Sequence, residues 1–447
     1  VENNFMKLLE LSASAAVAAI DAGQTTSEEL VKAYIDQIIA YDESVEAWEH
    51  FDAEQALAQA RVADKLRKSG SRTGPLQGIP IGVKDVFDTH DYPTEDGTVI
   101  HKGRTPGGDA GAVEFLRKAG AIIMGKTVTT EYAYYSPGKT KNPFDPKRTP
   151  GGSSSGSAAA VAANMVPLAI GTQTNGSVIR PASFCGVVGF KPSHGSISRH
   201  RTLLQSLQLD QVGVFARSVG DAALMAEALM QYDPRDSSMR SRMAPNILEL
   251  IKVGPLVPPR LAFIKTPAWD QADSDVKEGF TELVSFLGEA VEEIDLTHLL
   301  EEVYEWHQII MEVDIAKNFK KDYTRSKELM SPVLCELIER GNSYLAVDYN
   351  VAVEHIKALN NAMDEIMSEY DAILTPAAIG EAPLGLESTG SPIFCTPWTF
   401  CGMPAITLPL LQGSNNMPIG VQLVSEKGDD ARLLRTADWL TNLVASG

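Results

Sequence analysis

Apolar and polar residues alternate at helical spacing in the first part of the chain. Apolar side chains recur at helical intervals between residues 30 and 39, directly after Thr26-Ser27-Glu28-Glu29. This spacing predicts an amphipathic helix, and Thr26 or Ser27 is suited to cap its first turn. A second helix is expected over 53–68, which is rich in Ala, Glu, Gln, Lys and Arg, all good helix formers.

From residue 74 onward, short apolar runs alternate with amphipathic segments. The runs that predict strands are 76–85, 121–126, 261–264, 372–376, 405–409 and 419–424. Helices are expected between them, at 110–119 and at 351–370 among others. Alternation of this kind is typical of α/β proteins. Because strands occur toward both ends of the chain, we expect a single large domain, 1–447, with a central mixed β-sheet flanked by helices.

Composition and charge exclude several classes of function. Of the 447 residues, 44% are hydrophobic and 22% charged, so the chain can bury a large core without disulfides or metals. The formal net charge of −19 argues against nucleic acid or an anionic membrane as a partner. No apolar run is long enough to span a membrane, and the N-terminal residues 1–11 show no signal-peptide pattern.

The cysteines point to a reducing compartment. The four of them, Cys185, Cys335, Cys395 and Cys401, form no C-x-x-C pair and have no histidine at ligand spacing. A disulfide framework is not expected in a chain of this length. We therefore predict reduced thiols and a cytoplasmic location.

Candidate chemistry is concentrated in a segment dense in Gly, Ser and Pro, residues 138–195. It contains the clusters Gly151-Gly152-Ser153-Ser154-Ser155-Gly156 and Thr174-Asn175-Gly176-Ser177. A phosphate-binding loop would need a lysine where Ser157 stands, so that interpretation fails. A dinucleotide-binding fingerprint fails as well, because it needs a third glycine and an acidic residue after a strand.

Two further interpretations compete for the first cluster. A G-x-S-x-G nucleophile elbow is formally present around Ser154, but it requires a catalytic histidine and acid. None of the eight histidines lies in a catalytic-looking context. Without any function, the cluster would be a Gly/Ser turn leading into an alanine-rich helix. The second serine cluster, and a lone lysine in an apolar run at position 84, favour a catalytic segment instead.

Together these residues resemble the amidase signature family. The matching runs are 78–85, 149–195, 209–218, 375–376 and 402–409, and the resemblance covers almost the whole chain. It implies a Ser–cis-Ser–Lys triad in which Ser177 is the nucleophile. Ser153, after a cis peptide bond, is then the bridging serine, and Lys84 is the base.

Such a triad is chemically reasonable. A serine hydroxyl needs a base, and lysine, with an unperturbed pKa of about 10.4, is ordinarily charged at neutral pH. Burial disfavours the charged form and lowers the pKa; the apolar neighbours Ile81, Val83 and Val86 predict such burial for Lys84. A neutral Lys84 would take the proton of Ser153, which would take that of Ser177.

The resemblance also implies an oxyanion hole made of backbone N–H groups. These belong to Thr174, Asn175, Gly176 and Ser177. The family usually has glycine where Asn175 stands. If the position needs positive φ, asparagine is among the best-tolerated replacements, so we expect the hole to survive. The added side chain is expected to narrow the acyl pocket or to contact the substrate.

Several residues are candidates for supporting roles. The hydroxyls of Ser155, Thr172 and Thr174 are expected near the triad. Arg180 either anchors a substrate carboxylate or forms a structural ion pair with a neighbouring acid. Tyr135, in an aromatic cluster, is either a pocket wall or part of the core.

By this resemblance, the regions of the domain have different roles. They are N-terminal helices (1–70), a catalytic core (74–220), a variable and mostly helical region (221–370), and C-terminal strands and a helix returning to the core (371–447). The helical region is where the cover of the substrate pocket is expected.

The leading functional prediction is hydrolysis of a C–N bond in a small amide, anilide, carbamate or urea-type substrate. It proceeds through an acyl-enzyme, with side activity as an esterase or urethanase, no metal and no cofactor; a homodimer is a candidate assembly. The alternative is one component of a glutamine-dependent amidotransferase, which acts as a glutaminase and needs a partner protein. Asn175, and His194 where the family often has an aromatic residue, favour the first. A non-catalytic scaffold relative is a third hypothesis, disfavoured because all three triad residues are present.

Overall fold

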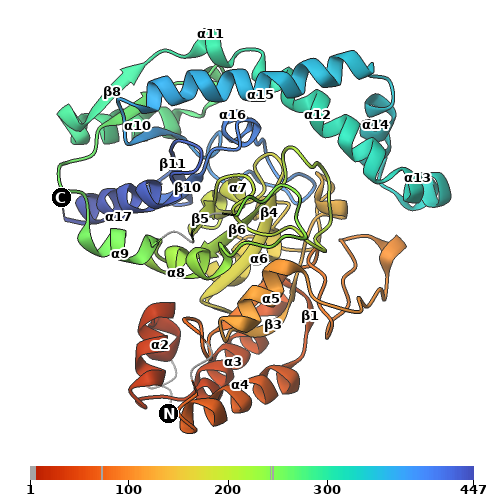
Figure 1. Ribbon diagram of the computed structural model, residues 1–447, viewed down its shortest axis with the longest axis vertical. Coiled ribbons are helices and arrows are strands. Elements are labelled where there is room, and N and C mark those ends of the chain that lie inside the picture. Colours follow the sequence, from red (N-terminus) through yellow and green to blue (C-terminus); the bar gives the residue numbers. More distant parts are fainter. Residues whose placement is uncertain (1–6, 72–73, 242, 244–245, 447) are drawn as a thin grey trace.

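Strands from both ends of the chain join one sheet. The computed structural model describes residues 7–71, 74–241, 243 and 246–446. Residues 1–6 lie outside the described residues. They belong to the expected N-terminal helical region and to the segment that shows no signal-peptide pattern. A single α/β domain with a large mixed sheet flanked by helices confirms the predicted fold class (Figure 1).

The sheet in the described part of the chain has eleven strands, in the order β1-β3-β2-β4-β6-β5-β10-β11-β9-β7-β8. Their bounds are β1 Trp48–Phe51, β2 Pro80–Lys84, β3 Ile122–Thr127, β4 Leu168–Gln173, β5 Val188–Lys191, β6 Gln211–Ala216, β7 Leu261–Ile264, β8 Val291–Ile294, β9 Ala372–Pro376, β10 Ala405–Gln412 and β11 Pro418–Val424. The pairs β2–β3, β2–β4, β7–β8 and β7–β9 are parallel. The other pairs are antiparallel.

Helices cover the sheet and extend beyond it at two ends. The α-helices are α2 Ala13–Asp21, α3 Ser27–Val45, α4 Ala53–Lys68, α5 Gly111–Lys118, α6 Ser155–Ala162, α7 Ile179–Phe184, α8 Val219–Leu229, α9 Ile247–Val253, α10 Ser274–Leu287, α11 Thr297–Leu300, α12 Val303–Asn318, α13 Lys320–Ser326, α14 Pro332–Gly341, α15 Ala346–Met367, α16 Thr396–Phe400 and α17 Asp430–Ser446. Short 3-10 turns lie at Val99–His101, Glu131–Ala133, Trp269–Gln271, Gly288–Ala290 and Lys327–Leu329. The helices α2–α4 and α12–α15 lie at opposite ends of the molecule (Figure 1).

Local sequence explains where several of these elements begin. Thr26 caps α3, because its hydroxyl accepts the N–H of Glu29 at 3.1 Å while the Glu29 carboxylate accepts the Thr26 N–H at 3.0 Å. Every residue of β2, β3 and β4 is buried, which accounts for their continuous apolar runs. The strand expected over 76–85 is shorter, since Gly78 has a φ of +81° and the chain turns there before it enters the sheet.

Among the elements that differ from the sequence prediction, helix α15 and strand β8 have clear local reasons. Helix α15 begins at residue 346 rather than 351 and ends at residue 367 rather than 370. Its first turn is fixed by the Asp348 carboxylate, which accepts the Leu345 N–H at 3.1 Å, and not by apolar spacing. Strand β8 was not predicted, because it is a short edge strand whose central residues Glu292 and Glu293 are exposed; acidic side chains are common on such edges.

The helical region packs directly against the centre of the molecule. Buried residues of α12, α14, α15 and α16 form one hydrophobic cluster with residues of β7 and β9. Tyr132, Leu209 and Cys395 belong to the same cluster. Side chains of the helical region therefore reach the glycine-rich segments of the core.

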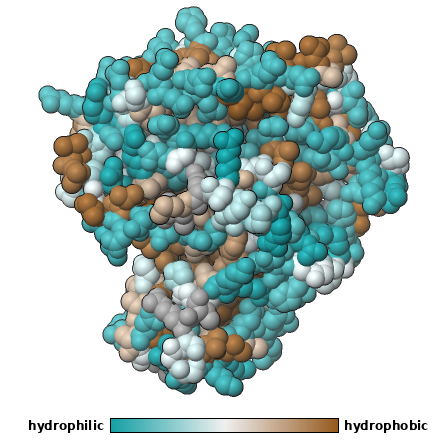
Figure 2. Space-filling view, viewed as in Figure 1, coloured by the Kyte–Doolittle hydropathy of each residue, from teal (hydrophilic) through white to brown (hydrophobic). Residues whose placement is uncertain are grey.

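The outer surface agrees with the acidic composition. Figure 2 shows a mostly hydrophilic face on which apolar residues form small, separate groups. Among the described residues, no helix combines the length and the apolar character needed to cross a membrane.

Candidate active site

Lys84 lies at the carboxyl end of β2, next to the end of β4. The two strands are parallel, with Val83 opposite Ile170, so Thr172 reaches the position beside Lys84. The Lys84 Nζ lies within hydrogen-bond distance of Ser153 Oγ, at 2.7 Å, and of Thr172 Oγ1, at 2.9 Å. None of the Lys84 side chain is exposed. The structure therefore brings together the predicted base, the predicted bridging serine and one of the predicted supporting hydroxyls.

The two serine clusters lie side by side. The peptide bond between Gly152 and Ser153 is cis, the geometry that the resemblance implied. The Ser154 N–H donates to the carbonyl of Ser177 at 3.4 Å, which joins the start of α6 to the loop between β4 and α7. Ser153 is 2% exposed and Ser177 9% exposed, so Ser177 is the more accessible of the two hydroxyls.

The surroundings of Lys84 favour a neutral amine. Burial lowers its pKa well below the usual value for lysine, and the Asp210 carboxylate opposes that shift only in part. Burial also raises the pKa of Asp210, to about 6. The adjacent Asp85 is paired with Lys126 at 2.9 Å. Within the described residues Lys84 has no ion pair, as expected for an amine that works as a base.

Backbone N–H groups of the predicted oxyanion hole are free to bind an oxygen. In the part of the chain that the structure describes, the N–H groups of Asn175, Gly176 and Ser177 have no acceptor. A Cβ at position 176 would lie 2.8 Å from the Pro392 Cβ and 3.2 Å from the Cys395 Sγ. Only glycine therefore fits at this position without displacing its neighbours.

Asn175 does not need the conformational freedom of glycine. Its backbone is not among the positive-φ positions of the described residues, so the reason given above for tolerating asparagine is wrong. Instead, the side chain is held in place: its Nδ2 donates to Tyr135 Oη at 3.2 Å, and its Oδ1 accepts from Thr396 Oγ1 at 2.8 Å. The asparagine therefore forms part of the wall around the site.

The remaining predicted hydroxyls lie around the site in different roles. Ser155 donates to the Val128 carbonyl at 3.3 Å and has no hydrogen bond to the three candidate catalytic residues. Thr174 Oγ1 lies 2.5 Å from Gln205 Oε1 and 2.7 Å from Asp210 Oδ1, within hydrogen-bond distance of both. Its hydroxyl therefore anchors the loop that carries the oxyanion hole.

The alternative nucleophile Ser154 is structural. It is fully buried, donates to the Thr172 carbonyl at 3.2 Å and accepts the Thr172 N–H at 3.3 Å. A nucleophile elbow follows a strand, but residues 148–150 contain only an isolated bridge from Arg148 to Leu384. These contacts do not support the elbow hypothesis.

Backbone and hydroxyl oxygens surround the guanidinium of Arg180. It is 1% exposed and donates to the carbonyls of Gly152 at 2.7 Å and Gly390 at 2.8 Å, and to Thr389 Oγ1 at 3.2 Å. No ion pair involves it within the described residues. The predicted ion pair of Arg180 is therefore wrong for the described residues, and its role as a substrate anchor stays a prediction. Short-range sequence could not show that three backbone and hydroxyl oxygens surround the guanidinium.

A cavity of about 670 Å³ opens beside these residues. Its lining residues are Tyr135, Ser136, Pro137, Ser331, Pro332, Val333, Glu387, Ser388, Thr389, Gly390 and Pro392. Thr389 and Pro392 also lie directly against two glycines of the site. A Cβ at Gly152 would lie 2.8 Å from Thr389 Cγ2, and a Cβ at Gly176 would lie 2.8 Å from Pro392 Cβ. The cavity therefore lies next to the two glycines that precede Ser153 and Ser177, and residues 331–333 of the helical region line part of it.

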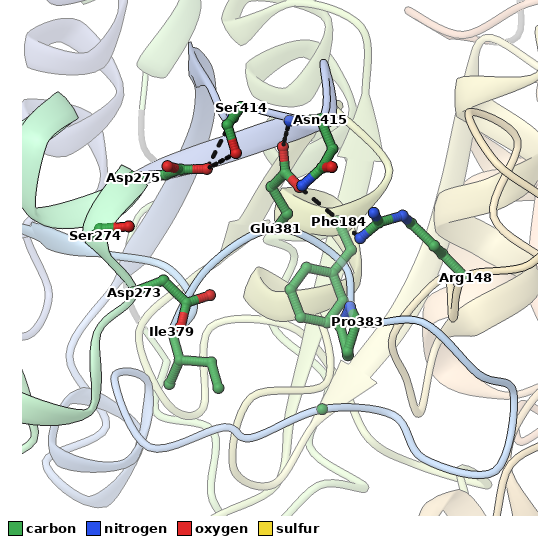
Figure 3. Close-up of a pocket in the computed structure, with 11 residues that line it drawn as sticks. Arg148, Phe184, Asp273, Ser274, Asp275, Ile379, Glu381, Pro383, Ser414 and Asn415 are labelled. Atoms are coloured by element: carbon green, nitrogen blue, oxygen red, sulfur yellow. Dashed lines mark hydrogen bonds and ion pairs between the residues drawn. The ribbon is translucent and has the colours of Figure 1, made fainter.

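A second cavity, of about 350 Å³, lies on the other side of Gly390. Figure 3 shows Glu381 between Asn415 and Arg148, with Asp275 bonded to Ser414. Its lining contains none of the three candidate catalytic residues. It is not the site of the predicted chemistry.

Metal-type donors cluster elsewhere. Among the described residues, the groups Glu49-His50-Glu95 and His90-Asp91-Asp109 each bring three such atoms together. Both groups already have charged partners, since Lys139 pairs with Glu49 at 3.3 Å and Arg117 pairs with Asp91 at 2.7 Å. Neither group includes a candidate catalytic residue.

Several residues of the site carried no sequence signal. Gln173 accepts the N–H groups of Val178 and Ile179 at 2.8 and 3.0 Å and so fixes the turn after Ser177. The side chains of His307 and Thr399 donate to backbone carbonyls of the loop 174–176. Gln173 and Asp210 lie in runs that match the family, 149–195 and 209–218, whereas His307 and Thr399 lie in none of the matching runs.

Comparisons with known proteins extend over nearly the whole chain. A family model described as Amidase matches residues 29–434. A glutamyl-tRNA(Gln) amidotransferase subunit from Lachnospira eligens is 34% identical, with 96% of this chain and 97% of the relative covered.

Solved structures agree with this likeness. A chain from a vestigial protein complex that reveals the evolutionary origins of an s-triazine catabolic enzyme has a TM-score of 0.90 at 26% identity, covering 97% of this chain and 98% of its own. A crystal structure of an amidase has a TM-score of 0.84 at 29% identity, with coverages of 97% and 99%.

Proposed function

The chain belongs to the amidase signature family, whose enzymes cleave C–N bonds, and on this premise we propose that it is the glutamine-hydrolysing component of an amidotransferase. The observation that carries the proposal is the 34% identity with a glutamyl-tRNA(Gln) amidotransferase subunit over 96% of the chain. This was the alternative predicted from the sequence. The relatives favour it over the small-amide hydrolase that we put first.

In the proposed reaction, Ser177 Oγ attacks the carbonyl carbon of the substrate carboxamide. Its proton passes to Ser153 Oγ while the proton of Ser153 passes to the neutral amine of Lys84, 2.7 Å away. Negative charge develops on the carbonyl oxygen, which accepts hydrogen bonds from the N–H groups of the loop 175–177. Removing one donor of this kind typically lowers kcat by about 10²–10³.

The same relay then runs in reverse. The protonated Lys84 returns a proton through Ser153 to the leaving nitrogen, the C–N bond breaks, and ammonia departs. A water molecule hydrolyses the ester on Ser177 by the same route and releases the acid. A lysine with a pKa held well below its usual value by burial suits both directions, because it must gain and lose a proton in each turnover.

The proposed function includes the use of the released ammonia in a second reaction. An amidotransferase delivers its nitrogen to a second substrate, so the proposed function includes a partner protein that binds the acceptor. A cytoplasmic location accompanies the proposal, and the four free cysteines fit a reducing compartment. Self-association into a homodimer stays a prediction.

A free-standing amidohydrolase is the second candidate. The side chain of Asn175, held between Tyr135 and Thr396, gives the approach to Ser177 a wall that the usual family glycine would not provide. The likeness to a solved amidase also supports it. Small amides, anilides, carbamates, ureas and esters are its candidate substrates.

The test is ammonia release from glutamine by the purified chain, alone and with the partner proteins of the amidotransferase, with Ser177→Ala measured in parallel. Turnover of glutamine that is lost in Ser177→Ala supports the proposal. Failure to use glutamine in both settings, with Ser177-dependent turnover of another amide, establishes the second candidate. Turnover that persists in Ser177→Ala refutes Ser177 as the nucleophile in either case.

A further inference from the structure

We propose that His307, on helix α12 of the helical region, is a positioning residue that sets the direction of the oxyanion-hole N–H groups through the carbonyl of Thr174. The inference rests on the proposed function only in needing a reaction at Ser177. It applies equally to glutamine or to another amide, ester or carbamate.

The contact is direct and fully enclosed. His307 Nε2 donates to the Thr174 carbonyl oxygen at 2.9 Å, and His307 is 1% exposed and Thr174 5% exposed. The two residues are 133 positions apart in the chain. An acceptor on Thr174 requires the proton to be on Nε2, which fixes the tautomer of the ring.

Peptide geometry carries the effect from the carbonyl to the hole. The carbonyl of one residue and the N–H of the next belong to one planar trans peptide and point in opposite directions. A donor that holds the carbonyl of Thr174 from behind therefore aims the N–H of Asn175 to the opposite side. That N–H has no acceptor among the described residues.

The next peptide is held in the same way. Thr399, in α16, donates to the Asn175 carbonyl at 2.5 Å and thereby aims the N–H of Gly176. Thr399 in turn accepts from Gln173 Nε2 at 2.9 Å. Two buried donors from distant parts of the chain, His307 and Thr399, thus hold the loop 174–176 in place.

The donor from His307 does not depend on pH in the working range. Burial lowers the pKa of His307 to about 4, and the charged groups that act on other buried sites do not reach it. Protonation would keep Nε2 as a donor as well. The contact therefore supplies a fixed hydrogen bond to the loop that carries the hole.

The test compares His307→Leu, which removes the donor, with His307→Gln, whose Nε2 can replace it. The control is His355→Gln, since His355 stacks on Trp306 at 3.7 Å and touches the same helix without reaching Thr174. We expect His307→Leu to lower kcat by about 10- to 100-fold with little change in KM, because the donors of the hole are misdirected rather than removed. His307→Gln should recover most of the loss, and His355→Gln should leave kcat unchanged.

The rate of covalent labelling by a serine-directed fluorophosphonate is measured on the same proteins. Ser177 Oγ attacks the phosphorus of this reagent and displaces fluoride, while a phosphoryl oxygen occupies the oxyanion hole. The labelling reaction therefore needs no glutamine. If glutamine is not turned over, labelling still tests the inference while the proposed function fails. Should His307→Leu not fold, His307→Asn, whose amide is too short to reach the carbonyl, takes its place. The inference would be overturned if His307→Leu, or His307→Asn in its place, had the same kcat and labelling rate as wild type. It would also be overturned if His307→Gln recovered none of the loss.

Discussion

Replacing Lys84 by methionine is expected to abolish catalysis and to stabilise the fold at neutral pH. Lys84 is fully buried and its pKa is held well below the usual value by that burial. In the unfolded chain the amine stays protonated up to about pH 10.4. Keeping it neutral in the folded protein therefore costs about 1.4 kcal/mol for each pH unit by which burial lowers its pKa.

Methionine has a similar length and no such cost, but it cannot form the two hydrogen bonds that Lys84 forms with Ser153 and Thr172. Each lost bond is worth about 1–1.5 kcal/mol. Because burial lowers the pKa of Lys84 well below its usual value, we expect the cost of the neutral amine to exceed the loss of these bonds and Lys84→Met to be more stable than wild type at pH 7. Activity should fall at least about 10²-fold, the contribution of a general base.

The pH dependence gives the sign of the effect. Because the pKa of Lys84 is lower in the folded than in the unfolded state, the destabilisation is greatest at low pH and disappears as pH rises toward about 10.4. The advantage of Lys84→Met should therefore shrink as the pH rises toward about 10.4, where only the lost hydrogen bonds remain.

Urea unfolding midpoints of wild type and Lys84→Met, measured at pH 7 and at pH 10, test the expected stability difference and its change with pH. The matched control is Lys126→Met: Lys126 is equally buried but is paired with Asp85 at 2.9 Å. That variant should lose stability at both pH values, because it leaves a carboxylate buried without its partner. A Lys84→Met protein less stable than wild type at pH 7, or a difference that does not change with pH, would refute the neutral lysine.

Other positions give sharper tests of packing and wall residues. Gly176→Ala should destabilise by about 1–3 kcal/mol from overpacking and lose activity, because its Cβ would meet Pro392 at 2.8 Å; Gly220→Ala, which meets nothing within 4 Å, is the thermal-unfolding control and should be neutral or stabilising. Arg180→Met should lower stability by about 2–4 kcal/mol, because it leaves two buried carbonyls without donors, and should reduce turnover of acidic and neutral substrates alike; a loss confined to acidic ones would support a role as substrate anchor. Asn175→Gly should lower KM for the bulkier amides by opening the wall of the cavity, with kcat for the smallest substrate little changed, as steady-state kinetics on a size series would show.

Long, locally encoded elements could be predicted well. Helix α4 and strands β7 and β9 have the bounds expected from their apolar or helix-forming runs, since burial of such runs depends little on which neighbour covers them. The short acidic edge strand β8 had no such signal. The approach of Lys84 to Ser153 could be expected only through the family motif, because the residues are 69 positions apart.

The sequence by itself determined the α/β class, the single mixed sheet and the three candidate catalytic residues, because these follow from apolar periodicity and from a long motif of fixed residue types. Only the tertiary structure decided what surrounds them. Arg180 became a ligand of backbone carbonyls, and His307 and Thr399 came to hold a loop 133 and 224 positions away. Hydrogen bonds of this kind depend on distances within the folded chain, which no local pattern of residues encodes.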